Sequence, residues 1–225
     1  MRVAVLASGR GSNFQSIIDA SKENKLPNCK LELLIVNKKE AYAVERAKKH
    51  NIAYKIIESK NKKREDFDHQ MLEVLAKNKI EIVVLAGFMR ILSKAFITKY
   101  KNRIINIHPS LLPLHPGAHA HRDVIKSGAK ESGCTVHFVD EGVDTGPIIM
   151  QETVAVDKND SEETLAAKIL PLEHQIFPKA LHLLTSKKLE IKEIPILTIY
   201  GNERSSFHLM YAIKFFFETI LKKIT

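Results

Sequence analysis

The spacing of hydrophobic residues along the chain predicts an alternation of strands and helices. Short, continuous apolar runs of the kind found in buried strands recur through the first half of the sequence. These predicted strands are residues 3–7, 31–36, 53–57, 80–86 and 103–107. Between them, apolar residues recur every three to four positions, which is helical spacing. The first predicted helix begins near Phe14. The others cover residues 41–50, 65–77 and 93–100.

The second half is less regular. A long loop rich in Pro, His and Gly covers residues 108–117. The elements predicted after it are a helix over 118–127, strands over 134–139 and 148–156, and a helix from Ser161 to about Thr185. Ser161 followed by two glutamates is typical of a helix N-terminus. Pro171 and Pro178 lie inside this last helix, where proline tends to introduce a kink.

Strands that alternate with helices imply right-handed crossovers, and so an α/β fold with a doubly wound, mostly parallel sheet. In such sheets ligands bind at the carboxyl ends of the strands. Three loops are predicted at that edge, residues 8–13, 87–92 and 106–117. The length of 225 residues fits one such domain. We assign it residues 1–190 and interpret residues 191–225 as a C-terminal extension with an amphipathic helix, not a separate domain.

The loop after the first strand reads Gly9-Arg10-Gly11-Ser12-Asn13. Glycines allow a positive φ and a close approach to a ligand, and a helix start offers unpaired N–H groups to an anion. The dinucleotide fingerprint would need a third glycine where Phe14 stands, so a nicotinamide site is not predicted. The alternative is a plain tight turn with Ser12 or Asn13 as the helix cap.

Asn106 and His108 are the strongest candidates for chemistry. Residues two apart on a strand face the same side, so both side chains project together near the ligand edge. An amide donor beside an imidazolium can stabilise the oxyanion formed in acyl transfer. Asp144 lies in a loop with two glycines, and its charge would favour a protonated His108 if the two met. Their separation along the chain leaves that contact open. The stretch ending at Pro113 is a candidate for a cis proline.

Other chemistries are less well supported. His115, His119 and His121 lie close together, but they form no helical pair and lack Cys or carboxylate partners at metal-site spacing, so no metal is predicted. The Gly-x-Ser-x-Gly elbow of many serine hydrolases is absent from the sequence. A non-catalytic nucleotide-binding module would explain the fold and the glycine loop, but not Asn106 and His108.

The composition limits the classes of binding partner that this protein is expected to have. The net charge of +9 comes from 35 basic and 26 acidic residues, and the lysines are scattered in pairs without interleaved aromatics. This favours solvated faces over nucleic-acid binding, which remains an alternative resting on charge alone. Two separated cysteines indicate a reducing compartment. The N-terminus does not resemble a signal peptide, and residues 207–221 are too short and too charged to span a bilayer. We therefore predict a cytoplasmic protein that binds small molecules rather than nucleic acid or membranes.

The stretches INIHPSLLPLHPGAHAHRDVI and DEGVDTGPII closely resemble the folate-dependent formyltransferases. The stretches VLASGRGSN and VVLAGFMRIL resemble the branch of that family that acts in purine synthesis. The resemblance covers residues 1–185 and implies a Rossmann-like formyltransferase fold. It implies transfer of a formyl group from 10-formyltetrahydrofolate to the amine of 5'-phosphoribosylglycinamide, in de novo purine (IMP) biosynthesis. Beyond about Pro195 the chain matches no pattern of the family.

The resemblance also implies roles for individual residues. The residues that match the catalytic set are Asn106, His108 and Asp144. The residues that match the ribonucleotide site are Gly11, Ser12, Asn13 and Glu173. The residues that match the folate site are Arg64, Met89, Arg90, Ile91, Leu92, Asn106 and Asp140. In the implied mechanism, Asn106 and a protonated His108 stabilise a tetrahedral intermediate, and Asp144 holds His108 charged and oriented.

Two other folate enzymes remain as alternatives. Methionyl-tRNA formyltransferase would carry a further C-terminal domain, for which this chain is short. Formyltetrahydrofolate deformylase would carry an N-terminal regulatory domain, whereas the first predicted strand here begins at Val3. The sequence leaves open a monomer or a homodimer. The many apolar residues of 207–221 predict that the extension either packs on its own domain or forms a partner surface.

Overall fold

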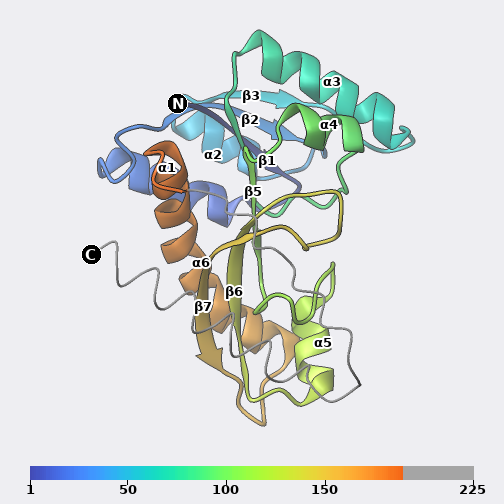
Figure 1. The fold of residues 1–225 in the computed structure, drawn as a ribbon, viewed down its shortest axis with the longest axis vertical. Helices are drawn as coiled ribbons and strands as arrows, with labels where there is room; N and C mark the ends of the chain where they lie inside the picture. Colours follow the sequence, from blue (N-terminus) through green and yellow to red (C-terminus); the bar gives the residue numbers. More distant parts are fainter. Residues whose placement is uncertain (190–225) are drawn as a thin grey trace, which may run out of the picture. The chain divides into compact units, whose positions relative to one another are not determined.

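The computed structural model of the chain describes residues 1–189 (Figure 1). The strands are β1 (Arg2–Ala7), β2 (Lys30–Val36), β3 (Ala53–Ile56), β4 (Ile82–Leu85), β5 (Ile104–His108), β6 (Glu131–Phe138) and β7 (Ile148–Ala155). The helices are α1 (Ser12–Lys22), α2 (Ala43–Lys49), α3 (Arg64–Lys77), α4 (Lys94–Lys99), α5 (Ala120–Ser127) and α6 (Glu162–Thr185). Each element predicted within residues 1–185 is present, with ends that differ from the prediction by a few residues.

The sheet has the order β3-β2-β1-β4-β5-β6-β7. The pairs from β3 to β5 are parallel, whereas β5–β6 and β6–β7 are antiparallel. The predicted doubly wound, mostly parallel sheet is therefore confirmed. The chain winds outward from β1 in both directions, because β2 lies on one side of β1 and β4 on the other. The carboxyl ends of β1 and β4 are thus the switch point at which such sheets bind ligands.

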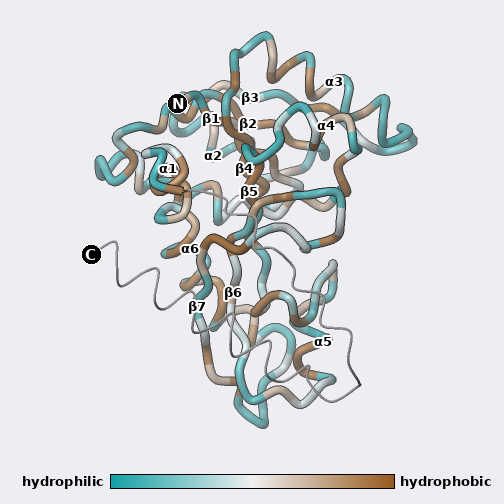
Figure 2. Tube along the Cα trace, in the orientation of Figure 1, coloured by the Kyte–Doolittle hydropathy of each residue, from teal (hydrophilic) through white to brown (hydrophobic). Residues whose placement is uncertain are grey.

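The core has two layers, one on each face of the sheet. Val3 and Val5 of β1 pack into the layer that contains α1, α2 and α6, whereas Ala4 and Leu6 pack into the layer that contains α3 and α4. Because β1 is buried on both faces, its sequence is a continuous apolar run rather than an alternation. Figure 2 shows the same hydrophobic character along the central strands.

Two of the helices have a side-chain N-cap, whereas α1 does not. The hydroxyl of Ser93 accepts a hydrogen bond from Phe96 N, and Ser161 forms a capping box with Thr164, as helix N-termini prefer. The N-cap of α1, by contrast, is Gly11, with φ of 69° and no side-chain cap. The alternative in which Ser12 or Asn13 caps this helix is therefore wrong. The loop carries its turn in the glycine backbone, which leaves both side chains available.

Residues Met1–Glu190 form one compact unit. The predicted extension, residues 191–225, lies outside the described residues, so the division of the chain stays a prediction. Within residues 1–189, no helix has the length and hydrophobicity needed to cross a membrane. The peptide bond between Leu112 and Pro113 is cis, in the stretch where a cis proline was considered.

Candidate active site

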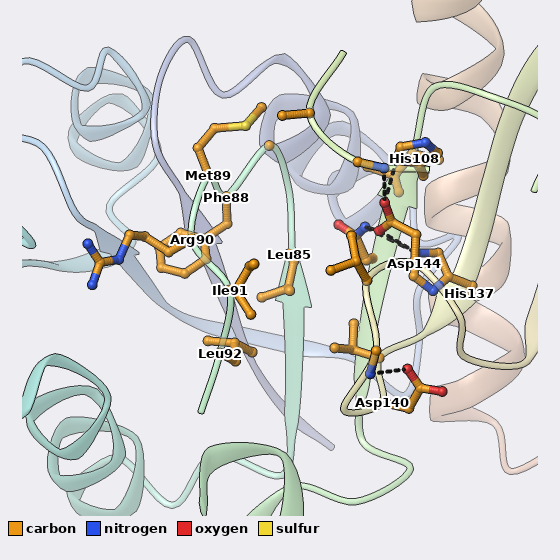
Figure 3. A pocket seen from close by; sticks show the side chains of 18 of the residues that line it. Leu85, Phe88, Met89, Arg90, Ile91, Leu92, His108, His137, Asp140 and Asp144 are labelled. Atoms are coloured by element: carbon orange, nitrogen blue, oxygen red, sulfur yellow. Dashed lines mark hydrogen bonds and ion pairs between the residues drawn. The ribbon is translucent and has the colours of Figure 1, made fainter. Parts of the chain in front are cut away.

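A cavity of about 340 Å³ lies at the carboxyl ends of β4 and β5 (Figure 3). One wall is the β4–α4 loop, residues 86–93, and the opposite wall is the β6–β7 loop, residues 139–147. Asn106 and His108, at the end of β5, line the cavity between these two loops. The cavity is therefore a cleft in which polar groups from one strand face a largely apolar rim.

Asp144 connects the polar groups of this cavity. Its Oδ2 lies 3.3 Å from His108 Nδ1, and its Oδ1 accepts a hydrogen bond from Asn106 Nδ2 at 3.4 Å. The backbone N–H of Gly117 donates to Oδ2 at 2.8 Å. The structure thus brings together the three residues Asn106, His108 and Asp144, which lie far apart in the sequence. Figure 3 shows Asp144 between His108 and His137 on one side of the cavity.

The loop that carries Asp144 is built around local hydrogen bonds. Asp140 Oδ1 accepts hydrogen bonds from Gly142 N at 3.1 Å and from Thr145 Oγ1 at 2.7 Å. Asp144 itself has φ of 55°, a conformation that residues other than glycine seldom adopt. Such strain persists where surrounding contacts fix it, and it is frequent at functional sites. The predicted folate residue Asp140 therefore lines the cavity and also shapes the loop that positions Asp144.

The charge of Asp144 is well defined. Burial by itself would raise the pKa of its carboxyl group, but His137, the Gly117 N–H and the nearby His108 together lower that pKa to about 2. Asp144 is consequently a carboxylate at every pH at which an enzyme normally works. Its negative charge is fixed beside two imidazole rings.

The surroundings of His108 act on its pKa in opposite directions. Nδ1 faces Asp144, and Nε2 lies 2.9 Å from the carbonyl oxygen of His115, so both ring nitrogens meet acceptors. Both contacts raise the pKa of His108, but burial lowers it by more, and the net shift is below the ordinary value for histidine. Desolvation disfavours the imidazolium and so acts against the expectation that Asp144 holds His108 charged, and that expectation stays a prediction.

His137 belongs to the cluster although the sequence analysis did not select it. Its Nε2 lies 3.1 Å from Asn106 Nδ2 and 3.5 Å from Asp144 Oδ1, and its Nδ1 faces the carbonyl oxygen of Phe138. His137 stands directly opposite Asn106 in the antiparallel pairing of β5 and β6. Opposite residues in such a pair share one face of the sheet, which places this ring beside the amide. Only the register could have revealed it.

The predicted ribonucleotide residues gather at the start of α1. Asn13 Nδ2 donates to Glu173 Oε2 at 2.7 Å, which joins the first loop to α6. Glu173 is 7% exposed, and burial raises the pKa of its carboxyl group. Gly11 precedes them in a left-handed conformation. Ser12 begins α1 and lines a second cavity of about 840 Å³ between α1 and α6. The four residues therefore surround one helix N-terminus.

The predicted folate residues divide between two places. Met89, Arg90, Ile91 and Leu92 line the cavity of Asn106 and His108. Arg64, in contrast, begins α3, is exposed and pairs with Glu65 at 3.2 Å. The structure does not bring it to the cavity wall. The β4–α4 loop is tied to the first loop, since Ser8 Oγ accepts a hydrogen bond from Met89 N at 2.8 Å.

The sequence profile of the formyl transferase family matches residues 1–181. The chain belongs to the formyl transferase family. The profile covers all seven strands and most of α6, so the cavity and both loops described above lie inside the matched region.

Individual relatives within the formyl transferase family agree. The phosphoribosylglycinamide formyltransferase of Escherichia coli is 42% identical over 194 residues, which are 86% of this chain and 91% of that protein. The trifunctional purine biosynthetic protein adenosine-3 of Chironomus tentans is 47% identical over 85% of this chain. The chain spans 14% of the length of that much longer relative.

Solved structures show the same formyl transferase fold. Glycinamide ribonucleotide transformylase 1 from Symbiobacterium toebii superposes with a TM-score of 0.83 at 40% identity, covering 85% of this chain and 91% of its own. The phosphoribosylglycinamide formyltransferase from Bacillus halodurans superposes with a TM-score of 0.80 at 44% identity, covering 84% and 97%. As for metals, residues 1–189 contain no group of three or more His, Cys, Asp or Glu residues arranged to hold an ion.

Proposed function

We propose that the chain transfers a formyl group from 10-formyltetrahydrofolate to the amine of 5'-phosphoribosylglycinamide. The observation that carries this proposal is Asp144, whose carboxylate contacts Asn106, His108 and the Gly117 N–H in the lining of the cavity. We further propose that the enzyme works in the cytoplasm on small molecules alone, as a monomer or homodimer, without a metal.

The chain offers a suitable surface for each of the two proposed substrates. Met89 and Ile91 of the β4–α4 loop are 66% and 58% exposed, and they offer an apolar wall to the flat ring system of a folate. The first loop offers glycine backbone and helix N–H groups to the phosphate of the ribonucleotide. The names of the Escherichia coli and Bacillus halodurans relatives support the same acceptor.

The residues of the cluster take the following parts in the proposed reaction. The amine attacks the formyl carbon, and the C=O electron pair becomes an oxyanion. Asn106 Nδ2 donates a hydrogen bond to this oxygen, and His108 Nε2 donates a second one in place of its contact with the carbonyl oxygen of His115. Such donors are usually the largest contribution that a preorganised site makes. The oxyanion electron pair then reforms the C=O bond as the C–N bond to the folate breaks, the folate nitrogen gains a proton and the amine nitrogen loses one. His108 or a bound water carries that proton.

The pKa of His108 is suited to this order of reaction steps. Burial lowers the pKa of His108 below its ordinary value, which favours the neutral ring that can accept a proton. The oxyanion adds a second negative charge beside the ring, next to that of Asp144, and an opposite charge at such a distance raises the pKa of an imidazole. We therefore expect His108 to become protonated as the intermediate forms rather than before.

The direct test is an assay with purified protein and 10-formyltetrahydrofolate, followed by the absorbance of the folate product. We expect product only when 5'-phosphoribosylglycinamide is added. Product without any acceptor would indicate a deformylase, and formylation of methionyl-tRNA would indicate the tRNA-modifying branch. Either result, or inactivity of a folded protein with both substrates, would refute the proposed function.

Glu173→Gln is expected to weaken ribonucleotide binding without lowering stability. The glutamine oxygen can still accept from Asn13, but the charged acceptor for a ligand hydroxyl is lost, which should raise KM for the ribonucleotide about tenfold. The folded-state pKa of Glu173 is raised, so the protonated carboxyl group stabilises the fold, and this contribution to stability is lost as pH rises through that pKa. Above it the glutamine variant should unfold at the same temperature as wild type or higher. Thermal melts at pH 5 and pH 8 with steady-state kinetics would check this, and a lower melting temperature at pH 8 would contradict it.

A further inference from the structure

Asp68, in the first turns of α3, is a buried carboxylate behind the wall of the active-site cavity. It is 1% exposed. Its Oδ2 accepts a hydrogen bond from the backbone N–H of Ser93 at 2.5 Å, at the end of the β4–α4 loop. Its Oδ1 is buried without a hydrogen-bond partner among residues 1–189. A charge in this position is costly to bury, so its contacts with the loop need a reason.

The residues beside Asp68 hold the same loop. Phe67 stacks on Phe88, with ring centroids 6.3 Å apart and planes inclined by 15°. The guanidinium of Arg90 lies 5.2 Å above the centroid of the Phe67 ring, and its Nη1 donates to the carbonyl oxygen of Ser59 at 3.5 Å. Burial raises the pKa of the Asp68 carboxyl group above its ordinary value, while the hydrogen bond with Ser93 and the positive charge of Arg90 act in the opposite direction. One face of α3 thus contacts the β4–α4 loop at its beginning, middle and end.

Successive side chains of the β4–α4 loop point alternately towards the protein interior and towards the cavity. Phe88 and Leu92 are buried, whereas Met89 and Ile91 are exposed at the cavity. Figure 3 shows Arg90 pointing away from the His108–Asp144 cluster. Arg90 therefore belongs to the anchored side of the loop, and Met89 and Ile91 form the side that a ligand would meet. A shift on the anchored side changes the shape of the wall.

We propose that Asp68 is a positioning residue for the folate donor. It fixes the β4–α4 loop through its hydrogen bond with Ser93 N–H, so that the wall formed by Met89 and Ile91 is ready to receive the flat ring system. This inference rests on the proposed function, since the donor is the ligand named there. Asp68 lies behind the wall and contacts neither the donor nor the reacting atoms, so its effect is transmitted through the loop.

The test replaces Asp68 by Asn, with Asp66→Asn as the matched control. Asp66 lies on the same helix and is exposed. Asn at position 68 keeps an acceptor for Ser93 N–H but removes the negative charge that strengthens this hydrogen bond. We expect KM for the donor to rise about tenfold, which corresponds to one charge-assisted hydrogen bond. The turnover number at saturating donor and KM for the acceptor should stay within about twofold of wild type, and Asp66→Asn should change none of the three.

A merely structural role would give a different pattern. If Asp68 only capped α4, the variant would melt at a lower temperature with an unchanged donor KM, and that result would overturn the inference. An equal rise in KM for the donor and KM for the acceptor would also overturn it. If Asp68→Asn does not fold, Asp68→Glu serves instead. It keeps the charge and displaces it by one methylene, and a folded Asp68→Glu with wild-type donor KM would be equally contradictory. Wild-type protein that is inactive with both substrates would refute the proposed function instead, before any variant is compared.

Discussion

Asp144→Asn is expected to lower the turnover number by about 10²–10³-fold while the protein stays folded. The carboxylate is the only group that contacts both His108 and Asn106 while also accepting from Gly117 N–H among the described residues. An asparagine oxygen can replace one of these contacts, but its NH₂ group then faces donors. His108 would lose the negative charge that helps it take a proton in the transition state. Both the orientation and the charge of the ring would be affected.

The fold should tolerate this change because asparagine adopts the left-handed conformation more readily than most residues. The φ of 55° at position 144 therefore needs no rearrangement. We expect KM for either substrate to change less than the turnover number, since the contact matters most once charge has developed. Steady-state kinetics beside the exposed control Asp66→Asn would measure the difference. Turnover within a few-fold of wild type would show that Asp144 has no catalytic part.

The same variant has a signature in stability against pH. The folded-state pKa of Asp144 is lowered to about 2, so the carboxylate stabilises the fold above its unfolded-state pKa, and this contribution is lost as pH falls towards 2. The shift corresponds to about 2 kcal/mol. Asp144→Asn should therefore be less stable than wild type at pH 7, and the difference should shrink between about pH 4 and pH 2. Denaturant unfolding at pH 7, 4 and 3 would test this, and a constant difference would contradict the assigned ionisation.

Gly11→Ala is expected to disable the first loop. Gly11 has φ of 69°, and a Cβ placed there would lie 2.7 Å from Ala43 Cβ and 3.0 Å from Ala43 Cα. Both the backbone conformation and the backbone of α2 resist the change, so the loop must move. We expect the free energy of unfolding to fall by about 1–3 kcal/mol. KM for the ribonucleotide should rise by at least about tenfold, because the N–H groups of the loop no longer point at one anion.

Gly9→Ala is the matched control for this prediction. A Cβ at Gly9 meets no atom within 4 Å, and its φ is not positive. We therefore expect its free energy of unfolding to stay within about 0.5 kcal/mol of wild type. Equal effects of the two substitutions on ribonucleotide KM would mean that the loop binds through features other than the geometry of Gly11.

The sequence by itself determined the order of the elements and the edge at which ligands bind. Each strand is a short apolar run with the length and periodicity of a buried strand, and each helix has its own spacing, so these signals are local. Alternation along β5 was enough to place Asn106 and His108 on one side, because the side-chain period of a strand is fixed by its backbone. The glycine-rich turn after the first strand could likewise be predicted from the sequence. The position of the α1 N-cap at Gly11 could not.

Only the tertiary structure decided which distant groups meet. Asp144 reaches His108 from a separate loop, and His137 stands opposite Asn106 because β5 and β6 pair antiparallel in one register. Register depends on packing of the whole sheet, and no local pattern in either strand encodes it. The direction of the His108 pKa shift also depended on burial, since desolvation is a property of the folded surroundings. The sequence therefore supplied the chemical groups of the site, and the fold supplied their distances and charges.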